Sequence, residues 1–483
     1  MKKFKSTPLL IILFLGYINI ITAQTEESQK EIIDFLFKDY IGKKPSASFI
    51  IIKDGKIKKC QSFGYANLEK EIKATCNTNY RLASVTKQFT AMAIMKLISQ
   101  GKLTYNTKLT EVLQDFPAYG KEITIRQLLN HRSGLIEYFK LYPKDSEQQI
   151  IDKDVLELLK KQDSTIFKPN KKFEYSNSGY ALLAQIVEKT SGTSFKKFMD
   201  KEIFNPLKMK GSTVYVKDLK IKNRAYGYKF NDSIYELKDQ HGWSAVQGDG
   251  GIYSSVKDYY KWDQALYSNS IITQEELKPA FTNWDENGIN NKEGYGFGWG
   301  IMTKNNTKYL VHSGGSIGFK NFVLRIPSKN ISVAILTNND DSGNQLKRKA
   351  IFLASFFSEG KITIPADVLL EQDIEHNGIG SIVEKFNQLK SNNKYNIVEE
   401  DLVSLGFNYL SKKEEKKALK IFELVKTEFP QYFGGYFGLA RYYNGKQENQ
   451  KALEFFEKVI ELITVENQGL INYSKKMIKE LSE

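Results

Sequence analysis

The sequence of 483 residues predicts an α+β domain followed by an α-helical repeat module. Strand-like segments lie near both ends of the first part of the chain, and helical segments lie between them. Strands so far apart in sequence can share one sheet if the helices pack around it, so we expect an antiparallel sheet flanked by helices. In the last part of the chain, small and apolar residues recur at a spacing of 34 residues, which is typical of helical repeats.

The N-terminal segment has the layout of a secretory signal. Three lysines among the first five residues precede an apolar stretch, Leu9–Ile21, and small and polar residues follow it. We expect cleavage after Ala23, so that residues 1–23 are a signal peptide and the protein is exported, either periplasmic or secreted. The alternative is a retained N-terminal membrane anchor, and association with a membrane would follow only in that case.

A β-hairpin is predicted at the start of the first domain. Ala47–Lys53 and Lys56–Gly64 have the character of short strands, and they are joined by an Asp-Gly dipeptide that favours a tight turn. Cys60 lies in the second strand and Cys76 in the next extended segment. In an oxidising compartment these cysteines can form a disulfide, but two buried free thiols agree equally well with the sequence.

A long helix is predicted to begin at Ser84 and to end near Ile98. Its residues are apolar almost continuously and Gly101 follows, so this helix should be buried nearly all round. The other predicted helices are Ile125–Asn130, Gly179–Thr190 and Ser194–Ile203, and the later strands are Tyr309–His312, Asn321–Ile326 and Ile331–Thr337.

Changes in composition divide the rest of the chain. We place the first domain at 24–364, a polar and less periodic linker at 365–395, and helical repeats at 396–483. Two helix pairs of the tetratricopeptide type are predicted, with a last helix from 468 to 481 over the open apolar face. The pattern positions are Leu405, Gly406, Tyr409, Ala418, Phe422 and Pro430, repeated at Leu439, Ala440, Tyr443, Ala452 and Phe456. An ordinary helical bundle is the alternative reading, and a repeat module would recruit a protein partner.

The net charge of +14 does not indicate nucleic-acid binding. The basic residues are spread along the chain, without the basic stripe or the aromatic-basic motif that such binding requires. The two cysteines and four histidines show no spacing typical of a zinc site. We therefore expect neither nucleic acid, metal nor another cofactor.

Ser84 and Lys87 are candidate catalytic residues. A serine needs a neighbouring base to act as a nucleophile, and the spacing of three residues puts both side chains on one face of a helix. Burial would favour the neutral, proton-accepting form of the amine. The same spacing occurs elsewhere, for example at Ser99 and Ser391, but only Ser84 follows a strand-and-turn segment and opens a long buried helix. The structural alternative is a helix cap beside a surface lysine.

Two later segments offer the other groups that a serine hydrolase needs. Tyr175 and Asn177 flank a serine just before a predicted helix, where the phenol could relay a proton. His312-Ser313-Gly314 ends one strand and leads into the next, and its glycine lets the backbone approach a substrate closely.

Three segments, in their order along the chain, resemble the three active-site elements of the serine β-lactamase and penicillin-binding-protein superfamily, in its class C-like branch. They are Ser84-Val85-Thr86-Lys87, Tyr175-Ser176-Asn177 and His312-Ser313-Gly314. The resemblance covers roughly residues 30 to 345. It implies an antiparallel sheet with an inserted helical lobe and an acyl-enzyme mechanism that uses no metal.

The resemblance also implies a role for each residue. Ser84 would be the nucleophile, Lys87 and Tyr175 would share the general-base and general-acid roles, and Asn177 would hold the substrate and orient Lys87. The third element, with Ser313 and Gly314, would bind substrate. The backbone N–H groups of Ser84 and Gly315 would form the oxyanion hole.

One departure from the superfamily bears on the substrate. Penicillin-recognising members carry lysine at the start of the third element, where this chain has His312, which is mostly uncharged at pH 7. We therefore predict an esterase or amidase acting through acyl-Ser84. The alternatives are a true β-lactamase or D,D-peptidase, and a catalytically silent peptide- or glycan-binding protein on the same fold.

Overall fold

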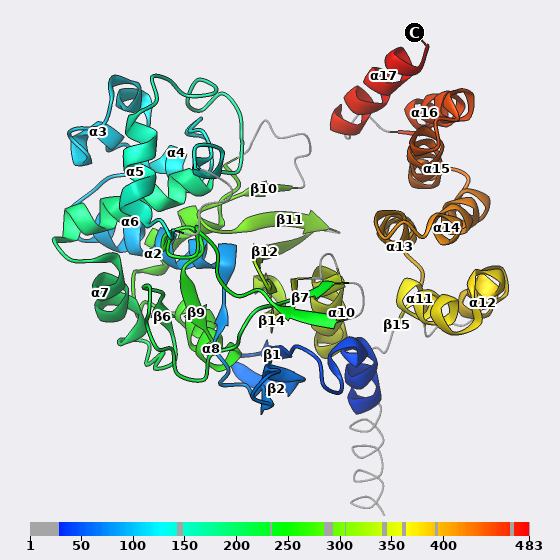
Figure 1. Cartoon of the computed structure of the whole chain (residues 1–483), viewed down its shortest axis with the longest axis horizontal. Coiled ribbons are helices and arrows are strands. Elements are labelled where there is room, and N and C mark those ends of the chain that lie inside the picture. The colour runs from blue at the N-terminus through cyan, green and yellow to red at the C-terminus, as the bar shows by residue number, and fades with distance from the viewer. Residues whose placement is uncertain are drawn as a thin grey trace, which may run out of the picture.

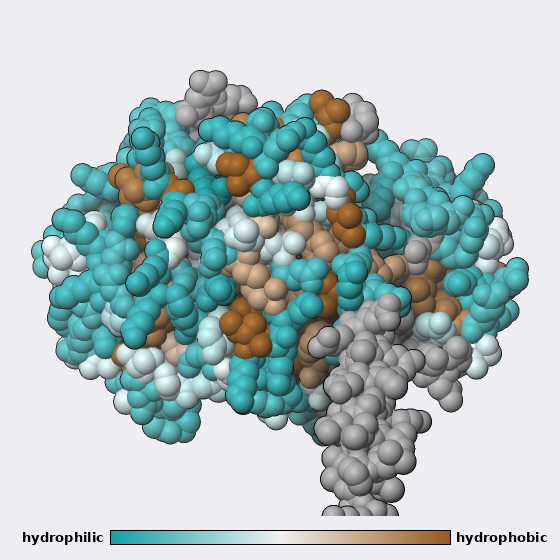
Figure 2. Space-filling model, turned by 90° about the horizontal axis from the view of Figure 1, so that it is seen from below, coloured by the Kyte–Doolittle hydropathy of each residue, from teal (hydrophilic) through white to brown (hydrophobic). Residues whose placement is uncertain are grey.

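The computed structural model describes residues 29–482, apart from 143–147, 232–233, 285–292, 305, 341–344, 360–363, 392–394 and 464–467. The expected signal peptide, 1–23, lies outside the described residues. Among the described residues, no helix is long and apolar enough to cross a membrane. On the face seen in Figure 2, apolar residues form small patches between polar ones.

A seven-stranded antiparallel sheet is the centre of the first domain (Figure 1). Its strand order is β10-β11-β12-β13-β14-β1-β2, so the N-terminal strands pair with strands from the far end of the domain. The predicted antiparallel sheet is thereby confirmed, and in its first hairpin Asp54 and Gly55 both have positive φ. The strands are β1 (Ala47–Lys53), β2 (Lys56–Phe63), β10 (Glu293–Tyr295), β11 (Gly300–Lys304), β12 (Thr307–Ser316), β13 (Phe319–Ile326) and β14 (Ile331–Thr337).

Both faces of this sheet are buried. Alternate side chains of a strand point to opposite faces. On β1, Ile50 and Ile52 join the core that contains the helical lobe, whereas Phe49 and Ile51 join a second core. This second core includes residues of the helical segment 29–36 and of α10 (Gln345–Glu359).

The helical lobe lies on one side of the sheet, and the C-terminal helices lie on the other (Figure 1). The central helix of the lobe, α2 (Thr86–Ser99), follows a short 3-10 turn at Ala83–Val85. It is buried along almost its whole length, as the sequence predicted. The other helices of the first domain are α3 (Leu109–Val112), α4 (Ile125–Leu129), α5 (Asp152–Lys160), α6 (Asn177–Ser191), α7 (Phe195–Met199), α8 (Val256–Ala265) and α9 (Gln274–Leu277).

Short strands connect the lobe to the main sheet. They are β5 (Tyr80–Arg81), β9 (Ile252–Ser254) and β6 (Thr213–Val214) in one small sheet, β3 (Tyr65–Asn67) with β4 (Ile72–Lys73), and β7 (Tyr228–Asn231) with β8 (Ile234–Leu237). Cys60 of β2 and Cys76 form a disulfide, which decides between the two alternatives that the sequence left open. The disulfide ties the edge of the main sheet to the segment that leads into β5.

The prediction of a less periodic linker at 365–395 is wrong, because this stretch forms two helices. They are α11 (Ala366–Asn377) and α12 (Ile382–Lys390). Their few apolar residues, among them Leu370, Ile374 and Phe386, recur at helical spacing and are buried in one core with the following helices. Most of their polar residues are exposed or partly exposed, whereas Asp367 is buried. A two-stranded parallel pair, β15 (Ile364–Pro365) and β16 (Tyr395–Asn396), brackets these helices.

Five further helices complete the C-terminal region. They are α13 (Glu399–Ser411), α14 (Glu415–Glu428), α15 (Phe433–Gly445), α16 (Asn449–Leu462) and α17 (Gln468–Ser482). Arg348 of α10 forms an ion pair with Asp367 and also donates a hydrogen bond to the carbonyl of Asp401. The helical region is therefore attached to the first domain through buried polar contacts as well as through the chain.

Candidate active site

The turn that carries Ser84 lies against strand β12. A Cβ on Gly314 would lie 2.2 Å from the carbonyl oxygen of Leu82, so only glycine permits this close approach. Asn321 of β13 donates from Nδ2 to the carbonyls of Arg81 and Leu82, at 2.9 and 3.2 Å. These contacts hold the segment before Ser84 against β12 and β13, two inner strands of the sheet, near the turn that joins them. Ala83 has a φ of 49°, a strained conformation for a residue with a Cβ.

Ser84 and Lys87 lie side by side. Lys87 Nζ is 3.4 Å from Ser84 Oγ, and the lysine side chain is buried. The same nitrogen donates to Asn177 Oδ1 and to the carbonyl of Asp249, both at 2.8 Å. The ring centroid of Tyr175 is 4.9 Å from Nζ. The first two predicted elements therefore meet at the amine of Lys87.

Glu137, which the sequence analysis did not single out, orients Asn177. Its carboxylate accepts from Asn177 N at 2.8 Å and from Asn177 Nδ2 at 3.1 Å, so the amide oxygen is turned toward Lys87. Burial raises the pKa of Glu137, while its hydrogen bonds act in the opposite direction. The only local sign of this residue is its position directly after the Ser-Gly-Leu-Ile segment, and 40 residues separate it from Asn177.

The turn at 248–251 forms another side of the site. Asp249 offers its carbonyl to Lys87, and its carboxylate accepts a hydrogen bond of 3.0 Å from the hydroxyl of Tyr138. Asp152 accepts from the backbone N–H groups of Gln247 and Gly248, at 2.8 and 2.9 Å. Burial raises the pKa of Asp152 to about 8. This buried carboxyl group therefore holds the turn in place from behind.

His312, the first residue of the third element, is buried and makes two hydrogen bonds. Its Nδ1 lies 2.6 Å from the carbonyl of Ser313, and Nε2 lies 2.8 Å from the hydroxyl of Tyr295. Because a carbonyl can only accept, Nδ1 carries the proton and Nε2 accepts from Tyr295. Burial, assisted by the charge of Lys87, lowers the pKa of His312 to about 4. His312 is thus a neutral group near pH 7.

His131 also belongs to this buried layer. Its Nδ1 accepts from the backbone N–H of Ser176 at 3.0 Å, and its ring lies 4.2 Å from that of Tyr175 and 4.5 Å from that of Tyr295. Burial lowers its pKa well below the usual value. These contacts agree with a structural role. Phe297, which is close in sequence to Tyr295, does not line the pocket over Ser84. Its ring stacks on that of Trp284, with ring centroids 5.5 Å apart.

A pocket of about 270 Å³ opens over Ser84. It is lined by Arg81, Ala83, Ser84, Tyr138, Phe139, Asn177, His241, Trp243, Asp249, Gly250, Gly315 and Ser316. Of the expected site residues, Ser84, Asn177 and Gly315 line this pocket, and Lys87, Tyr175 and His312 lie in the layer beneath it. Ser313 is exposed and does not line the pocket, and Gly314 packs against Leu82.

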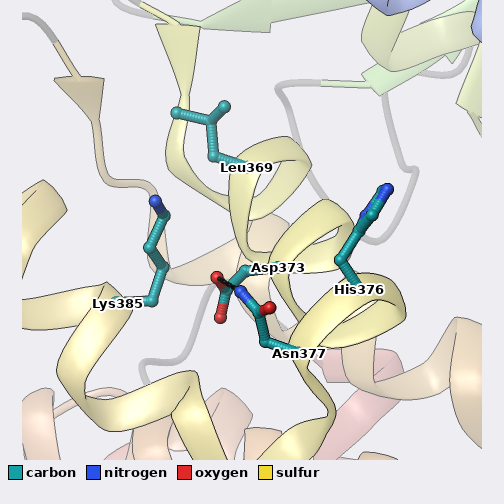
Figure 3. A pocket seen from close by; sticks show the side chains of 5 residues that line it. All are labelled: Leu369, Asp373, His376, Asn377 and Lys385. Carbon is teal, nitrogen blue, oxygen red and sulfur yellow. Dashed lines mark hydrogen bonds between the residues drawn. The ribbon is translucent and has the colours of Figure 1, made fainter.

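A second, smaller hollow lies between α11 and α12 (Figure 3). Its carboxylate, that of Asp373, already accepts hydrogen bonds from Asn377 at 2.8 Å and from Ser381. No nucleophile with a neighbouring base lines it, so the pocket over Ser84 is the candidate active site.

The state of His312 gives a testable pH dependence. Its pKa is about 4 in the folded protein and near 6.5 in the unfolded chain, so the unfolded chain binds the proton first as the pH falls. Stability is then lost between pH 6.5 and pH 4. From pH 7 to pH 5 the free energy of unfolding should fall by about 2 kcal/mol more in the wild type than in His312→Gln.

Urea unfolding of both proteins at the two pH values measures this difference. The buried carboxyls with raised pKa values, such as Asp152 and Asp249, act in the opposite direction but are present in both proteins, so their effects cancel. An equal loss of stability in the two proteins would mean that His312 is protonated normally in the folded state.

Comparisons with known proteins identify the family to which the first domain is similar. The profile of the family described as Beta-lactamase matches residues 33–356. Penicillin-binding protein 4* of Bacillus subtilis (strain 168) is 33% identical over 298 residues, which cover 58% of this chain and 65% of that protein. Protein flp of Staphylococcus aureus (strain NCTC 8325 / PS 47) is 29% identical over 333 residues, covering 65% of this chain and 64% of that protein. The chain thus spans less than two thirds of the length of these curated relatives.

A solved structure has the same fold. The octameric penicillin-binding protein homologue from Pyrococcus abyssi superposes with a TM-score of 0.60 at 28% sequence identity, and the match covers 69% of this chain and 77% of that chain. The family match extends over most of the chain and contains every residue of the candidate active site. This chain therefore belongs to the Beta-lactamase family of serine hydrolases.

Proposed function

We propose that the protein is an exported serine hydrolase that cleaves an ester or amide through an acyl-Ser84 intermediate. The observation that carries the proposal is the position of Ser84 in a pocket with the buried amine of Lys87 at 3.4 Å from Oγ. An amine so close can take the hydroxyl proton when Oγ attacks a carbonyl. Asn177 and the carbonyl of Asp249 hold that amine in place from the other sides.

The reaction has two halves. In the first, Oγ of Ser84 bonds to the carbonyl carbon, its proton passes to the Lys87–Tyr175 pair, and the N–H groups of Ser84 and Gly315 stabilise the oxyanion. The bond to the leaving group then breaks, and the leaving group takes that proton. In the second half, water gives a proton to the same pair and its oxygen bonds to the carbonyl carbon of the acyl-Ser84 ester. The bond from this carbon to Oγ then breaks, Oγ takes the proton back from the pair, and the acid is released.

The environment of His312 argues against the way in which penicillin-recognising enzymes hold a substrate carboxylate, which uses a cation of the third element. A buried neutral histidine whose two ring nitrogens are both engaged offers no cation for a substrate carboxylate at the third element. We therefore propose that the pocket does not recognise β-lactams in the manner of penicillin-binding enzymes. A chromogenic cephalosporin tests this point directly.

A fluorophosphonate probe tests the proposed nucleophile. We expect the probe to label the wild-type protein on the peptide that contains Ser84, because the probe forms a covalent bond only with an activated serine. Peptide mass spectrometry locates the label. Ser99, three residues before Lys102 at the exposed end of the same helix, is an internal control with the same spacing. Label on Ser99, or no label at all, would contradict the proposal.

We also propose that α13 to α16 form two tetratricopeptide-type repeats that bind a protein partner. Equivalent positions 34 residues apart are buried in both helix pairs, for example Ala418 and Ala452, and Phe422 and Phe456. A Cβ on Gly406 would lie 2.4 Å from the ring of Phe422, so the two helices of this pair pack at a distance that needs a small residue.

The disulfide between Cys60 and Cys76 supports export, because disulfides persist in oxidising compartments.

A further inference from the structure

Arg81 is a buried cation in the pocket over Ser84, and among the described residues its side chain has no hydrogen-bonding partner. Its side chain is only 3% exposed, and it is one of the residues that line the pocket. Its Nε and Nη1 are buried and make no hydrogen bond. Within the part of the chain that the structure describes, no carboxylate forms an ion pair with Arg81.

The position of Arg81 is held by its backbone and by two aromatic rings. It lies on β5, where it pairs with Tyr253 of β9, and its carbonyl accepts from Asn321. The guanidinium carbon is 5.9 Å from the ring centroid of Tyr215 and 6.0 Å from that of Tyr253. Such contacts stabilise a cation, but they leave its N–H donors unused.

The carboxyl group of Asp249 lines the same pocket, and the charge of Arg81 acts to lower its pKa, but no hydrogen bond or ion pair joins the two groups in the described part of the chain. The carboxylate of Asp249 accepts from the hydroxyl of Tyr138, and burial raises the pKa of this carboxyl group. His241, on the pocket wall, has its pKa lowered to about 4 by burial and by the charge of Arg81. Arg81 therefore meets neither an ion-pair partner nor a second cation in the ring of residues that lines the pocket.

An arginine keeps its charge in any protein environment, and a buried charge with unused donors is costly unless something pairs with it. We propose that Arg81 binds a carboxylate of the substrate, which makes the substrate an anionic ester or amide. The planar guanidinium can donate two parallel hydrogen bonds to a carboxylate, which a neutral side chain cannot do. This inference rests on the proposed serine hydrolase function and adds the charge of its substrate.

The other walls of the pocket suit an organic anion rather than a small inorganic one. Phe139 and Trp243 line the pocket, with ring centroids 5.7 Å apart, and can cover the apolar part of an acyl chain or of a leaving group. Arg81 and Ser84 line the same pocket and are three residues apart, so a single substrate can present its carboxylate to Arg81 and its scissile carbonyl to Ser84.

Matched pairs of esters test this proposal. One pair is p-nitrophenyl hemiglutarate and p-nitrophenyl butyrate, which places the carboxylate in the acyl half. The other is 3-carboxyphenyl butyrate and phenyl butyrate, which places it in the leaving group. We expect Arg81→Met to lower the ratio of kcat/KM for the anionic over the neutral ester by about 10- to 100-fold in at least one pair. Arg81→Lys should keep an intermediate ratio, because it retains the charge but not the two parallel donors.

Lys320 provides the control. Its Nζ would lie 3.4 Å from a Cβ on Gly315, so it is a second cation near the pocket. Lys320→Met should leave both ratios unchanged. A fall in the ratio for Lys320→Met but not for Arg81→Met would overturn the proposal, and so would unchanged ratios in Arg81→Met.

Two further measurements separate the possible failures. Fluorophosphonate labelling of Ser84 in Arg81→Met shows that the pocket is intact, whereas an unlabelled wild type would overturn the hydrolase proposal itself. Sodium glutarate should raise the Tm of the wild type more than glutaramide does, and this difference should disappear in Arg81→Met. Equal shifts for the two compounds in the wild type would overturn the role of Arg81, even if its variants do not fold.

Discussion

Replacing Ser84 by alanine is expected to lower kcat/KM for an ester substrate by about 10⁴- to 10⁶-fold. Among the described residues that line the pocket, Ser84 is the only one whose hydroxyl forms a hydrogen bond with the Lys87 amine, so no neighbouring side chain can replace it. Residual activity would reflect binding and the oxyanion hole alone. Steady-state kinetics with p-nitrophenyl butyrate measure the change.

The matched control for this variant is Ser99→Ala. Ser99 has the same spacing to a lysine and lies at the other end of the same helix, but it is exposed and far from the pocket. Its substitution should leave kcat/KM within about twofold of the wild type, as is usual for surface substitutions. Hydrolysis that survives in Ser84→Ala would move the active site elsewhere and favour a binding function for the pocket over Ser84.

Replacing Lys87 by methionine should lower kcat by about 10²- to 10⁴-fold, the range that general-base catalysis contributes. Methionine is similar in volume, so the buried helix keeps its packing while the proton acceptor is lost. Asn177 Oδ1 and the carbonyl of Asp249 lose their donor in this variant. The loss of activity should exceed the change in stability, which thermal unfolding reports separately.

Lys96→Met is the control for Lys87→Met. Lys96 belongs to the same helix and donates one hydrogen bond of 2.7 Å to the carbonyl of Ile271, but it has no contact with Ser84. We expect full activity with a small loss of stability. If Lys87→Met retained activity within about tenfold, Tyr175 alone would be the base, and the shared role proposed here would be wrong.

Much of the fold could be predicted from local patterns. The Asp-Gly hairpin of β1 and β2 and the buried helix α2 lie almost at their predicted positions. Turn residues and continuous apolar stretches predict such elements because these elements depend mainly on residues close in sequence. The region 365–395 could not be predicted in the same way. Its apolar residues are few, and they become a helical face only where α13 and α14 supply the other half of a core.

The candidate site shows the same division. Ser84, Lys87, Tyr175, Asn177 and His312 could be found from their motifs, and the structure brings them around one amine. Glu137 could not be found, because its role consists of two hydrogen bonds to a residue 40 positions away.

The sequence by itself determined the α+β class, the order of the three segments that meet at the candidate active site and the candidate residues that they carry. Only the tertiary structure decided that His312 is buried and neutral, that Cys60 and Cys76 pair, and that Arg81 reaches the pocket without a partner. The physical reason is that charge state and accessibility depend on groups distant in sequence, whereas spacing along a helix or strand depends on neighbours alone.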